Sequence, residues 1–347
     1  MNMDFPISIS IVMPVYNTPT EYLKESVESI IGQSFEDFEF VIIDDGSTNG
    51  NADYLDSLND QRIRIIRNPQ NIGITKSLNI GLRAAKGKYI ARMDSDDISV
   101  PWRLEKQYYF MEEHPDVIMC GSFVSIAGKP APEYSPRFSF SCNMQKYRAS
   151  LLFGYPGPNH PTVFLSHELL LKNNLEYDER LKYSQDYGLY CKIAKIGKIC
   201  ILNDKLLMIR IHKDRITCAH RTEQIECDKV IMRALLEELL GEISCEELDF
   251  HFRYSVGCNK EVIAPGVIPW YRRIEKANHR CRIYDRRSIR NEIENIESNL
   301  IHNLITGDHP FRKKIELVKY IFAPVFYGQL IVEFKSRIAN IFRTTKK

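Results

Sequence analysis

The chain has 347 residues, of which 44% are hydrophobic and 27% are charged, and its formal net charge at pH 7 is +2. This length and composition predict a globular protein with a substantial core, organised as one large domain with an appendage. The small net charge excludes a protein that binds polyanions through its whole surface.

Cysteine usage and the N-terminus bear on the cellular compartment. The nine cysteines are scattered, with no CxxC pair and no spacing typical of a zinc site or a disulfide framework. Such a set predicts reduced thiols in a cytosolic compartment. Asp4 stands where a signal peptide carries positive charge. We therefore expect a cytoplasmic protein.

Strands and helices are predicted to alternate over the first hundred residues. Apolar, largely β-branched runs predict strands, and apolar residues at helical spacing predict helices. The strands are residues 7–13, 38–43, 63–66 and 89–93, and the helices are residues 20–33 and 74–85. This order predicts a mostly parallel sheet covered by helices on both faces, with ligands bound beyond the carboxyl ends of the strands.

A polar segment lies beyond each predicted strand. These segments are residues 14–17, 44–47, 71–73 and 94–97. Each one alone is typical of a turn or a helix cap. Because the four segments are expected at the same edge of one sheet, together they predict a ligand site.

The last of these segments, residues 94–97, reads Asp-Ser-Asp-Asp. Carboxylates this close repel one another unless a cation neutralises them. Mg²⁺ commonly binds one or two carboxylates together with substrate phosphates, so the segment predicts a metal-nucleotide site. The alternative is a solvated turn in which Asp96 and Asp97 cap a helix that starts near Pro101.

In this order, the four segments resemble the nucleotide-sugar-binding half of a family 2 glycosyltransferase with a GT-A fold. The matching residues are IVMPVYN at 11–17, VIIDDGS at 41–47, NIG at 71–73, SLN at 77–79 and YIARMDSDD at 89–97. As a combination these motifs are highly specific. The resemblance implies a nucleoside-diphosphate sugar donor, most often UDP-linked, inversion at the anomeric carbon, and Mn²⁺ or Mg²⁺ on the donor diphosphate.

The resemblance also implies roles for donor-side residues. Asp96 would bind the metal directly, Asp97 would support it or contact the donor sugar, and Asp94 would reach the ribose or the metal's waters. Lys76 and Arg92 would counter the diphosphate charge, or act as surface or structural cations. The other donor-binding residues implied are Pro14, Tyr16, Asn17, Asp44, Asp45, Asn71, Gly73 and Ser95.

The candidate general base lies downstream, in residues 177–190. This stretch resembles a family segment that ends in a Glu-Asp pair at the start of a helix, where the second carboxylate is the base. Gln185 replaces the glutamate, and Asp186 keeps the position of the base. A glutamine can still orient an acceptor hydroxyl by hydrogen bonding. The alternative for Asp186 is a helix N-cap.

Two histidines complete the predicted site. His160 lies in residues 157–162, which match a family loop on the acceptor side. His212 ends an Arg-x-His segment that starts at Arg210, and it would join the metal shell or contact the diphosphate. The alternative for His212 is a structural role.

Beyond residue 220 the pattern is helical and the resemblance fades. Residues 225–240 and 289–305 carry apolar positions at helical spacing. Basic clusters at residues 270–290 and in the tail would face anionic lipid, nucleic acid or solvent. Charged interruptions in residues 315–342 exclude a membrane-spanning helix, and predict either an amphipathic interfacial helix or one docked on the core or a dimer partner.

These observations predict an α/β GT-A domain at residues 1–220, with a Rossmann-like, mostly parallel sheet. Residues 1–125 would bind the nucleotide sugar and residues 126–220 would form the acceptor side. A helical extension at residues 221–347 would contact a membrane or form homo-oligomers.

The expected activity is a metal-dependent, inverting transfer of a hexose or N-acetylhexosamine. The donor would be a UDP-sugar, and the acceptor a hydroxyl of a glycan or polyprenyl-linked oligosaccharide in surface polysaccharide synthesis. We expect no nucleic acid partner, and peripheral contact with the inner face of the plasma membrane is compatible with the basic C-terminal helices. The alternatives are a sugar nucleotidyltransferase, which would carry a Gly-rich basic loop after the first strand, and a non-catalytic nucleotide-sugar-binding module.

Overall fold

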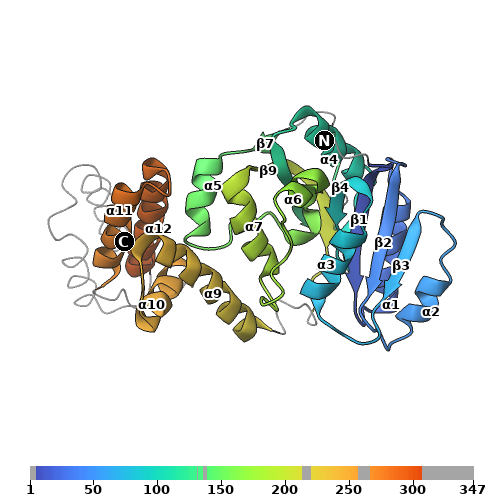
Figure 1. The fold of residues 1–347 in the computed structure, drawn as a ribbon, viewed down its shortest axis with the longest axis horizontal. Coiled ribbons are helices and arrows are strands. Elements are labelled where there is room, and N and C mark those ends of the chain that lie inside the picture. The colour runs from blue at the N-terminus through green and yellow to red at the C-terminus, as the bar shows by residue number, and fades with distance from the viewer. Residues whose placement is uncertain (1–4, 131, 136–138, 213–219, 257–265, 307–347) are drawn as a thin grey trace, which may run out of the picture. The chain divides into compact units, whose positions relative to one another are not determined.

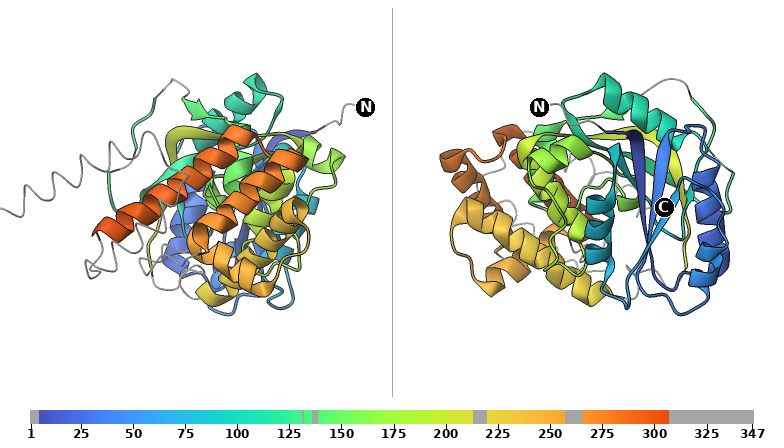
Figure 2. Two further views of the ribbon diagram at one scale, coloured as in Figure 1. Left: turned by 90° about the vertical axis from the view of Figure 1, so that its left-hand side faces the viewer. Right: turned by 45° about the vertical axis from the view of Figure 1, so that its right-hand side comes forward.

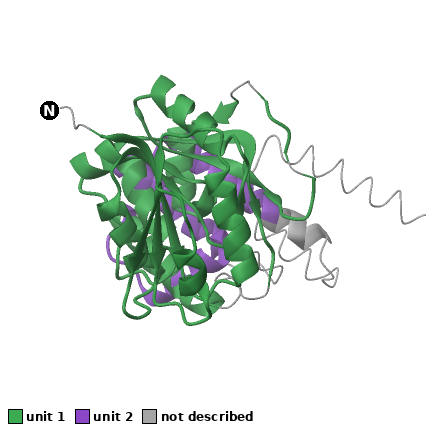
Figure 3. Cartoon of the chain, turned by 90° about the vertical axis from the view of Figure 1, so that its right-hand side faces the viewer, with its two compact units in different colours: residues 1–238 green, residues 239–347 purple. Residues whose placement is uncertain are grey.

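The computed structural model of the chain describes residues 5–130, 132–135, 139–212, 220–256 and 266–306. The chain divides into two units, residues 1–238 and 239–347 (Figure 3). The division lies inside helix α9 (Arg221–Leu240), so most of this helix belongs to the first unit. The functional boundary expected at residue 220 stays a prediction.

Parallel strands form one half of the sheet of the first unit. Their order is β3 (Ile63–Arg67), β2 (Phe38–Asp44), β1 (Ile7–Val15) and β4 (Gly87–Arg92). Every residue of β2 is buried, as its continuous apolar pattern requires of a central strand. The mostly parallel sheet that the sequence predicts is confirmed, with strand ends moved by at most two residues.

The other half of the sheet is mixed. Among the described residues the sheet has nine strands, and after β4 the order continues with β8, β6, β9 and β5, while β7 pairs with β9. β8 runs antiparallel to both neighbours. These strands are β5 (Ile98–Ser99), β6 (Val117–Ile126), β7 (Phe140–Ser141), β8 (Phe164–Ser166) and β9 (Lys198–Ile209).

Helices cover both faces of the sheet (Figures 1 and 2). Ile11 of β1 belongs to the same buried cluster as Val27 of α1, whereas Val12, on the opposite face of β1, meets α3. A Cβ at Gly81 of α3 would lie 2.3 Å from Val12 Cγ1, so only glycine allows this approach. Besides α9, the described helices of this unit are α1 (Thr20–Ile31), α2 (Asn51–Asp56), α3 (Ile74–Ala84), α4 (Arg103–Glu113), α5 (Met144–Leu151), α6 (His167–Lys172), α7 (Gln185–Ile196) and the 3₁₀ turn η1 (His160–Thr162).

Two cysteines of this unit form a disulfide. Cys142 follows β7 and Cys200 lies in β9, and the pairing of β7 with β9 brings their Cα atoms to 4.5 Å. The prediction that all the cysteines are reduced thiols is therefore wrong for this pair. The 58-residue separation gave no recognisable pattern, because strand pairing rather than sequence spacing brings the two together. Among the described residues, Cys120, Cys191, Cys227 and Cys281 are free cysteines.

The second unit is helical, as expected. It contains α10 (Cys245–Ser255), α11 (Val267–Cys281) and α12 (Arg286–Thr306). A capping box between Ser244 and Glu247 starts α10, and the Trp270 indole donates to His251 Nδ1 at 3.0 Å in the interior. Among the described helices, none has the length and apolar character needed to cross a membrane. The amphipathic segment expected at residues 315–342 lies outside the described residues.

Candidate active site

The register of the parallel strands brings the first two polar loops together. Val15 pairs with Asp44, so both loops leave the sheet at the same level. The Asn17 N–H donates to Ser47 Oγ at 3.1 Å, and the Thr48 N–H donates to Asn17 Oδ1 at 2.8 Å. Asn17 therefore joins the two loops, whereas the ring of Tyr16 is 50% exposed and free to stack on a base.

Asp45 organises the third loop. This buried carboxylate accepts hydrogen bonds from the Ile72 N–H at 3.0 Å, the Gly73 N–H at 2.9 Å and the Asn68 side chain at 2.8 Å. Both of its oxygens are thus engaged with the protein. Gly73 has φ +94°, which favours glycine, and the loop that it shares with Asn71 depends on Asp45 for its shape.

Asp44 is the more available member of the acidic pair. Its Oδ1 accepts the Ser47 N–H at 3.0 Å, and its Oδ2 lies 3.9 Å from Arg67 Nε. A carboxylate oxygen without a close donor can still accept a hydrogen bond from a ligand. The two adjacent aspartates therefore differ in their contacts, which the sequence does not show. Asp45 is fully engaged in hydrogen bonds with the protein, whereas Asp44 can still accept a hydrogen bond from a ligand.

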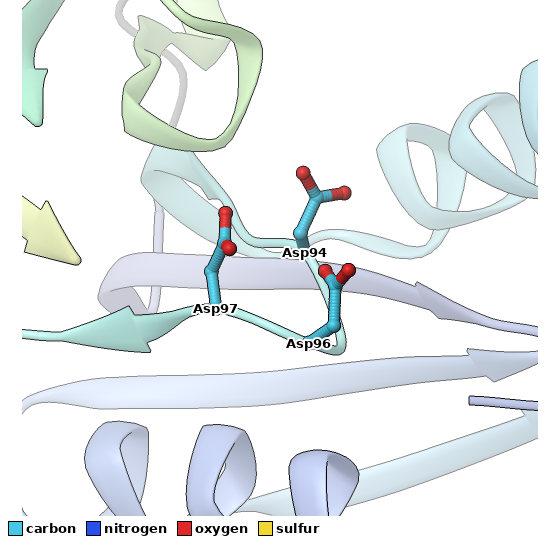
Figure 4. Close-up of side chains that lie close together, drawn as sticks. All are labelled: Asp94, Asp96 and Asp97. Atoms are coloured by element: carbon cyan, nitrogen blue, oxygen red, sulfur yellow. The ribbon is translucent and has the colours of Figure 1, made fainter. Parts of the chain in front are cut away.

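The loop after β4 gathers three carboxylates. One oxygen from each of Asp94, Asp96 and Asp97 lies within 4.8 Å of the others, and the three side chains point to the same side of the loop (Figure 4). Helix α1 anchors this loop, because Ser26 Oγ donates to the Asp94 carbonyl at 2.9 Å. The Ser95 hydroxyl lies 2.6 Å from the Thr18 hydroxyl.

The helix-cap interpretation of this cluster is wrong. Strand β5 follows the loop, and α4 starts only at Arg103, with Trp102 at its N-cap position and no side-chain cap. Asp96 and Asp97 therefore lie too early in the chain to cap the helix.

The electrostatics of the cluster suit a cation. Burial, together with the charges of Asp94 and Asp96, raises the pKa of Asp97 to about 8. Burial and the Asp94 charge also raise the pKa of Asp96, although the hydrogen bond with His212 opposes this. Three convergent carboxylates, of which Asp96 and Asp97 have disfavoured ionised forms, fit Mg²⁺ or Mn²⁺, since both are hard ions that prefer oxygen ligands.

The segment after β9 closes over the cluster. His212 Nε2 lies 2.8 Å from Asp96 Oδ2, and the Arg210 N–H donates to Asp97 Oδ1 at 3.0 Å. The Arg210 guanidinium lies 4.6 Å from the centre of the Tyr22 ring and pairs with Glu25. Sequence reasoning missed Tyr22 and Glu25 as partners of this segment, because Tyr22 is one of the apolar positions at helical spacing in α1 and Glu25 looks like an ordinary surface position.

Arg92 lies buried beneath the cluster. Its Nη2 is 2.5 Å from Asp94 Oδ1, while Nε and Nη1 have no hydrogen-bond partner within the described part of the chain. The fully buried Arg103 donates from Nη2 to the Arg92 carbonyl at 2.7 Å. Lys76, by contrast, is exposed on α3. Diphosphate contacts for both cations stay predictions.

Asp186 is the second residue of α7. Ser184 takes the N-cap position with φ +56°, so the interpretation of Asp186 as the cap is wrong. Burial raises the pKa of Asp186, whereas the neighbouring Tyr155 hydroxyl, a hydrogen bond from the Tyr187 N–H and the charge of Arg92 oppose the shift. Arg92 also pairs with Asp94. The Arg92 guanidinium therefore interacts electrostatically with both Asp186 and the acidic cluster.

The other two acceptor-side residues are buried. Gln185 begins α7 directly beside Asp186. His160 Nε2 lies 2.8 Å from the Tyr177 hydroxyl, and burial and the Arg92 charge hold the pKa of His160 well below its usual value. His160 is therefore a neutral hydrogen-bonding group, and acceptor contact by either residue stays a prediction.

Comparison with known proteins agrees with this arrangement. Residues 10–170 match the family model described as glycosyl transferase family 2. An uncharacterised glycosyltransferase of Methanocaldococcus jannaschii is 38% identical over 217 residues, which cover 60% of this chain and 72% of that protein. An uncharacterised glycosyltransferase of Haemophilus influenzae is 29% identical over 247 residues, which cover 69% of this chain and 76% of that protein.

The fold is also similar to a solved structure. The crystal structure of residues 1–349 of TarS from S. aureus in complex with UDP-GlcNAc superposes with a TM-score of 0.56 at 18% identity, covering 86% of this chain and 89% of that chain. Against a longer TarS structure, the chain spans 54% of that protein. The strand order, the acidic loop after β4 and these similarities lead to one assignment: the chain belongs to glycosyl transferase family 2 and has a GT-A fold.

Proposed function

We propose that this protein transfers a hexose or N-acetylhexosamine from a UDP-sugar to an acceptor hydroxyl, with a divalent metal and with inversion at the anomeric carbon. The observation that carries the proposal is the convergence of Asp94, Asp96 and Asp97 within 4.8 Å, with His212 bound to Asp96. The UDP-GlcNAc complex of the similar TarS structure supports the choice of donor.

The donor would lie across the loops at the carboxyl ends of the parallel strands. Tyr16 offers an exposed ring on which the base can stack, and Asp44 has an oxygen that can accept a hydrogen bond from the base or ribose. Asp96 and His212 are the proposed metal ligands, with Asp97 and Asp94 beside them. When bound there, Mn²⁺ or Mg²⁺ offsets the negative charge that develops on the departing diphosphate.

Asp186 would act as the general base. Its raised pKa makes it a stronger proton acceptor than an ordinary aspartate, and Gln185 next to it offers an amide that can orient the acceptor. The proton leaves the acceptor hydroxyl for the Asp186 carboxylate as the new bond forms on the face of the sugar opposite the diphosphate. Base catalysis of this kind typically contributes about 10²- to 10⁴-fold in rate.

The proposed acceptor is a glycan or a polyprenyl-linked oligosaccharide in surface polysaccharide synthesis. In the second unit, exposed cations on α11, at its C-terminal end and at the start of α12 suit contact with an anionic membrane surface. These cations are Lys276, Arg280, Arg282, Arg286 and Arg287. The same proposal includes a cytoplasmic location, peripheral membrane contact, the absence of a nucleic acid partner and homo-oligomer formation.

Thermal unfolding with and without ligand tests the donor and the metal together. We expect UDP-GlcNAc or another UDP-sugar to raise the melting temperature in the presence of Mn²⁺ and much less in EDTA, because ligands of the native state stabilise it. Asp96→Asn should abolish the Mn²⁺-dependent part. No stabilisation by any UDP-sugar with Mn²⁺ would contradict the proposal.

Membership of the family argues against a sugar nucleotidyltransferase, and β1 ends with Pro14-Val15 and continues into Tyr16-Asn17 rather than into a glycine-rich loop. A non-catalytic nucleotide-sugar-binding module remains as the alternative to an enzyme. The Asp186→Asn variant distinguishes the enzyme from the module. If the protein is an enzyme, the unaltered protein transfers sugar, and Asp186→Asn abolishes this transfer while UDP binding persists.

A further inference from the structure

The surroundings of Asp186 are rich in tyrosine. Burial raises the pKa of Tyr147, Tyr155, Tyr177 and Tyr190, and the nearby Asp186 charge raises each of them further. Three of these rings are buried, whereas Tyr155 is 39% exposed. Within this group, Tyr155 therefore presents an aromatic surface to solvent beside the proposed base.

The position of the Tyr155 ring is fixed by its neighbours. It stacks on the Tyr190 ring with centroids 5.6 Å apart and an interplanar angle of 21°. The Tyr187 ring packs edge-on against it at 6.0 Å. The Tyr155 hydroxyl donates to the Pro158 carbonyl at 2.5 Å. A side chain held at both ends in this way loses little further entropy when a ligand binds.

Helix geometry places this ring on the side of α7 that carries Asp186. Asp186 and Tyr190 are four residues apart in α7, so they lie one above the other on the same face of the helix. Tyr155 covers Tyr190 and also touches Tyr187, the residue after Asp186. The mechanism described above assigns no task to this exposed ring.

An exposed aromatic ring beside a carboxylate suits one class of acceptor. A pyranose ring has an apolar face of C–H groups and an edge of hydroxyl groups, so it can pack on an aromatic surface while a hydroxyl accepts or donates hydrogen bonds at its rim. A linear polyol phosphate has no comparable flat apolar face. The arrangement of Tyr155 and Asp186 therefore favours a sugar ring over an open-chain acceptor.

We propose that Tyr155 is an acceptor-binding residue that stacks on the apolar face of a pyranose ring and so directs a ring hydroxyl toward Asp186. This inference rests on the proposed function, because it takes Asp186 as the base. It goes further by naming the chemical class of the acceptor: a sugar residue in pyranose form. Tyr155 sets which acceptors bind, and the acidic cluster acts on the donor.

Saturation-transfer NMR on the full chain, with UDP and Mn²⁺ present, tests this inference. The ligands are methyl glycosides of glucose, galactose, mannose, N-acetylglucosamine, N-acetylgalactosamine and rhamnose, with glycerol 1-phosphate as the open-chain comparison. We expect at least one glycoside to receive saturation on its ring protons and glycerol 1-phosphate to receive much less. Tyr155→Phe should keep this signal, since the ring remains.

Loss of the ring should weaken glycoside binding about tenfold in Tyr155→Ala and in Tyr155→Leu, which keeps apolar bulk. Tyr109→Ala, at a similarly exposed tyrosine on α4, is the matched control and should bind like the unaltered protein. UDP affinity, measured by calorimetry, should stay within about twofold in every variant.

Unchanged glycoside binding in both Tyr155→Ala and Tyr155→Leu would overturn the inference and leave the proposed function standing. Two further results would overturn the inference in the same way. Glycerol 1-phosphate would receive as much saturation as the glycosides, or no glycoside would receive saturation while UDP binds. Failure of the unaltered protein to bind UDP with Mn²⁺ would instead overturn the proposed function, and the inference with it.

Discussion

His212 Nε2 lies 2.8 Å from Asp96 Oδ2, although the two residues are 116 positions apart in the chain. Strand pairing explains the contact. Ile98 of β5 pairs with Met208 of β9, so the acidic loop just before β5 meets the segment just after β9. The end of the β9 strand thus completes a site that the β4 loop begins.

Removing the Asp96 carboxylate should therefore impair metal binding first. We expect Asp96→Asn to weaken Mn²⁺ affinity, measured by calorimetry in the presence of UDP, by at least about 100-fold, because a direct ligand is lost. His212→Ala should weaken it by about 10- to 100-fold. Asp53→Asn changes an exposed carboxylate of α2 and serves as the control. Equal Mn²⁺ affinity in Asp96→Asn and Asp53→Asn would refute the ligand assignment.

The raised pKa of Asp97 predicts that stability depends on pH in the metal-free protein. The folded state retains a proton on Asp97 up to about pH 8, whereas an ordinary aspartate loses it near 3.8. Between these values the folded state holds more protons than the unfolded state, so the free energy of unfolding falls as pH rises. The slope for one group is at most about 1.4 kcal/mol per pH unit.

Urea unfolding in EDTA, at several pH values from about 5.5 to 8.5, checks this slope. Because burial raises the pKa of Asp228 to about 6, the Asp97 contribution is taken from the difference between the unaltered protein and Asp97→Asn. Asp97→Asn should flatten the dependence, because an amide does not titrate. Saturating Mn²⁺ should also flatten it, by stabilising the ionised carboxylates. Identical pH profiles for Asp97→Asn and the unaltered protein would show that Asp97 does not carry the effect.

Arg103 should be important for stability despite its charge. It is fully buried, burial and the neighbouring Arg92 lower its pKa to about 9, and it donates to the Arg92 carbonyl and to Gln107 Oε1. Arg103→Met leaves both acceptors without their donor, and we expect a loss of about 2–4 kcal/mol in the free energy of unfolding.

The matched control for Arg103 is Arg83→Met, because Arg83 forms an exposed ion pair with Glu176 on the same unit. Exposed pairs contribute little, so this change should cost less than about 1 kcal/mol. Urea denaturation measures both variants. Similar losses in the two would mean that the buried hydrogen bonds of Arg103 add nothing.

Asp45 should matter for donor binding through the loop that it holds. Asp45→Asn replaces one accepting oxygen by a donor, so it cannot satisfy the Ile72 and Gly73 N–H groups together with Asn68. We expect UDP to bind about tenfold more weakly, with little change in the rate at saturating donor. A reduced rate with unchanged UDP affinity would point to a different role.

The strongly patterned parts of the fold were predictable from sequence. The β-branched runs at β1, β2, β3 and β4 identified the parallel strands, and hydrogen bonds of Asn17 and Asp45 join the polar loops beyond the first three of them. β8 was not predictable, since three residues are too short to show a period. Its antiparallel insertion between β4 and β6 links the parallel strands to the mixed half of the sheet.

The supporting residues of the site were beyond sequence reasoning for a different reason. Arg103 in α4 and Glu25 in α1 look like solvated charges of amphipathic helices, and only tertiary packing shows one fully buried and the other paired with Arg210. The exposure of Tyr155 beside Asp186 likewise depends on how the loop before η1 folds back onto α7.

The proposed role of Asp186 as the base of a metal-dependent transferase is tested most directly by UDP release from UDP-sugars in the presence of Mn²⁺ and the methyl glycosides. The unaltered protein should release UDP, and EDTA should stop it. Asp186→Asn should lower the rate at least about 100-fold while UDP affinity is retained. Release that persists in EDTA, or an Asp186→Asn variant as fast as the unaltered protein, would contradict this account.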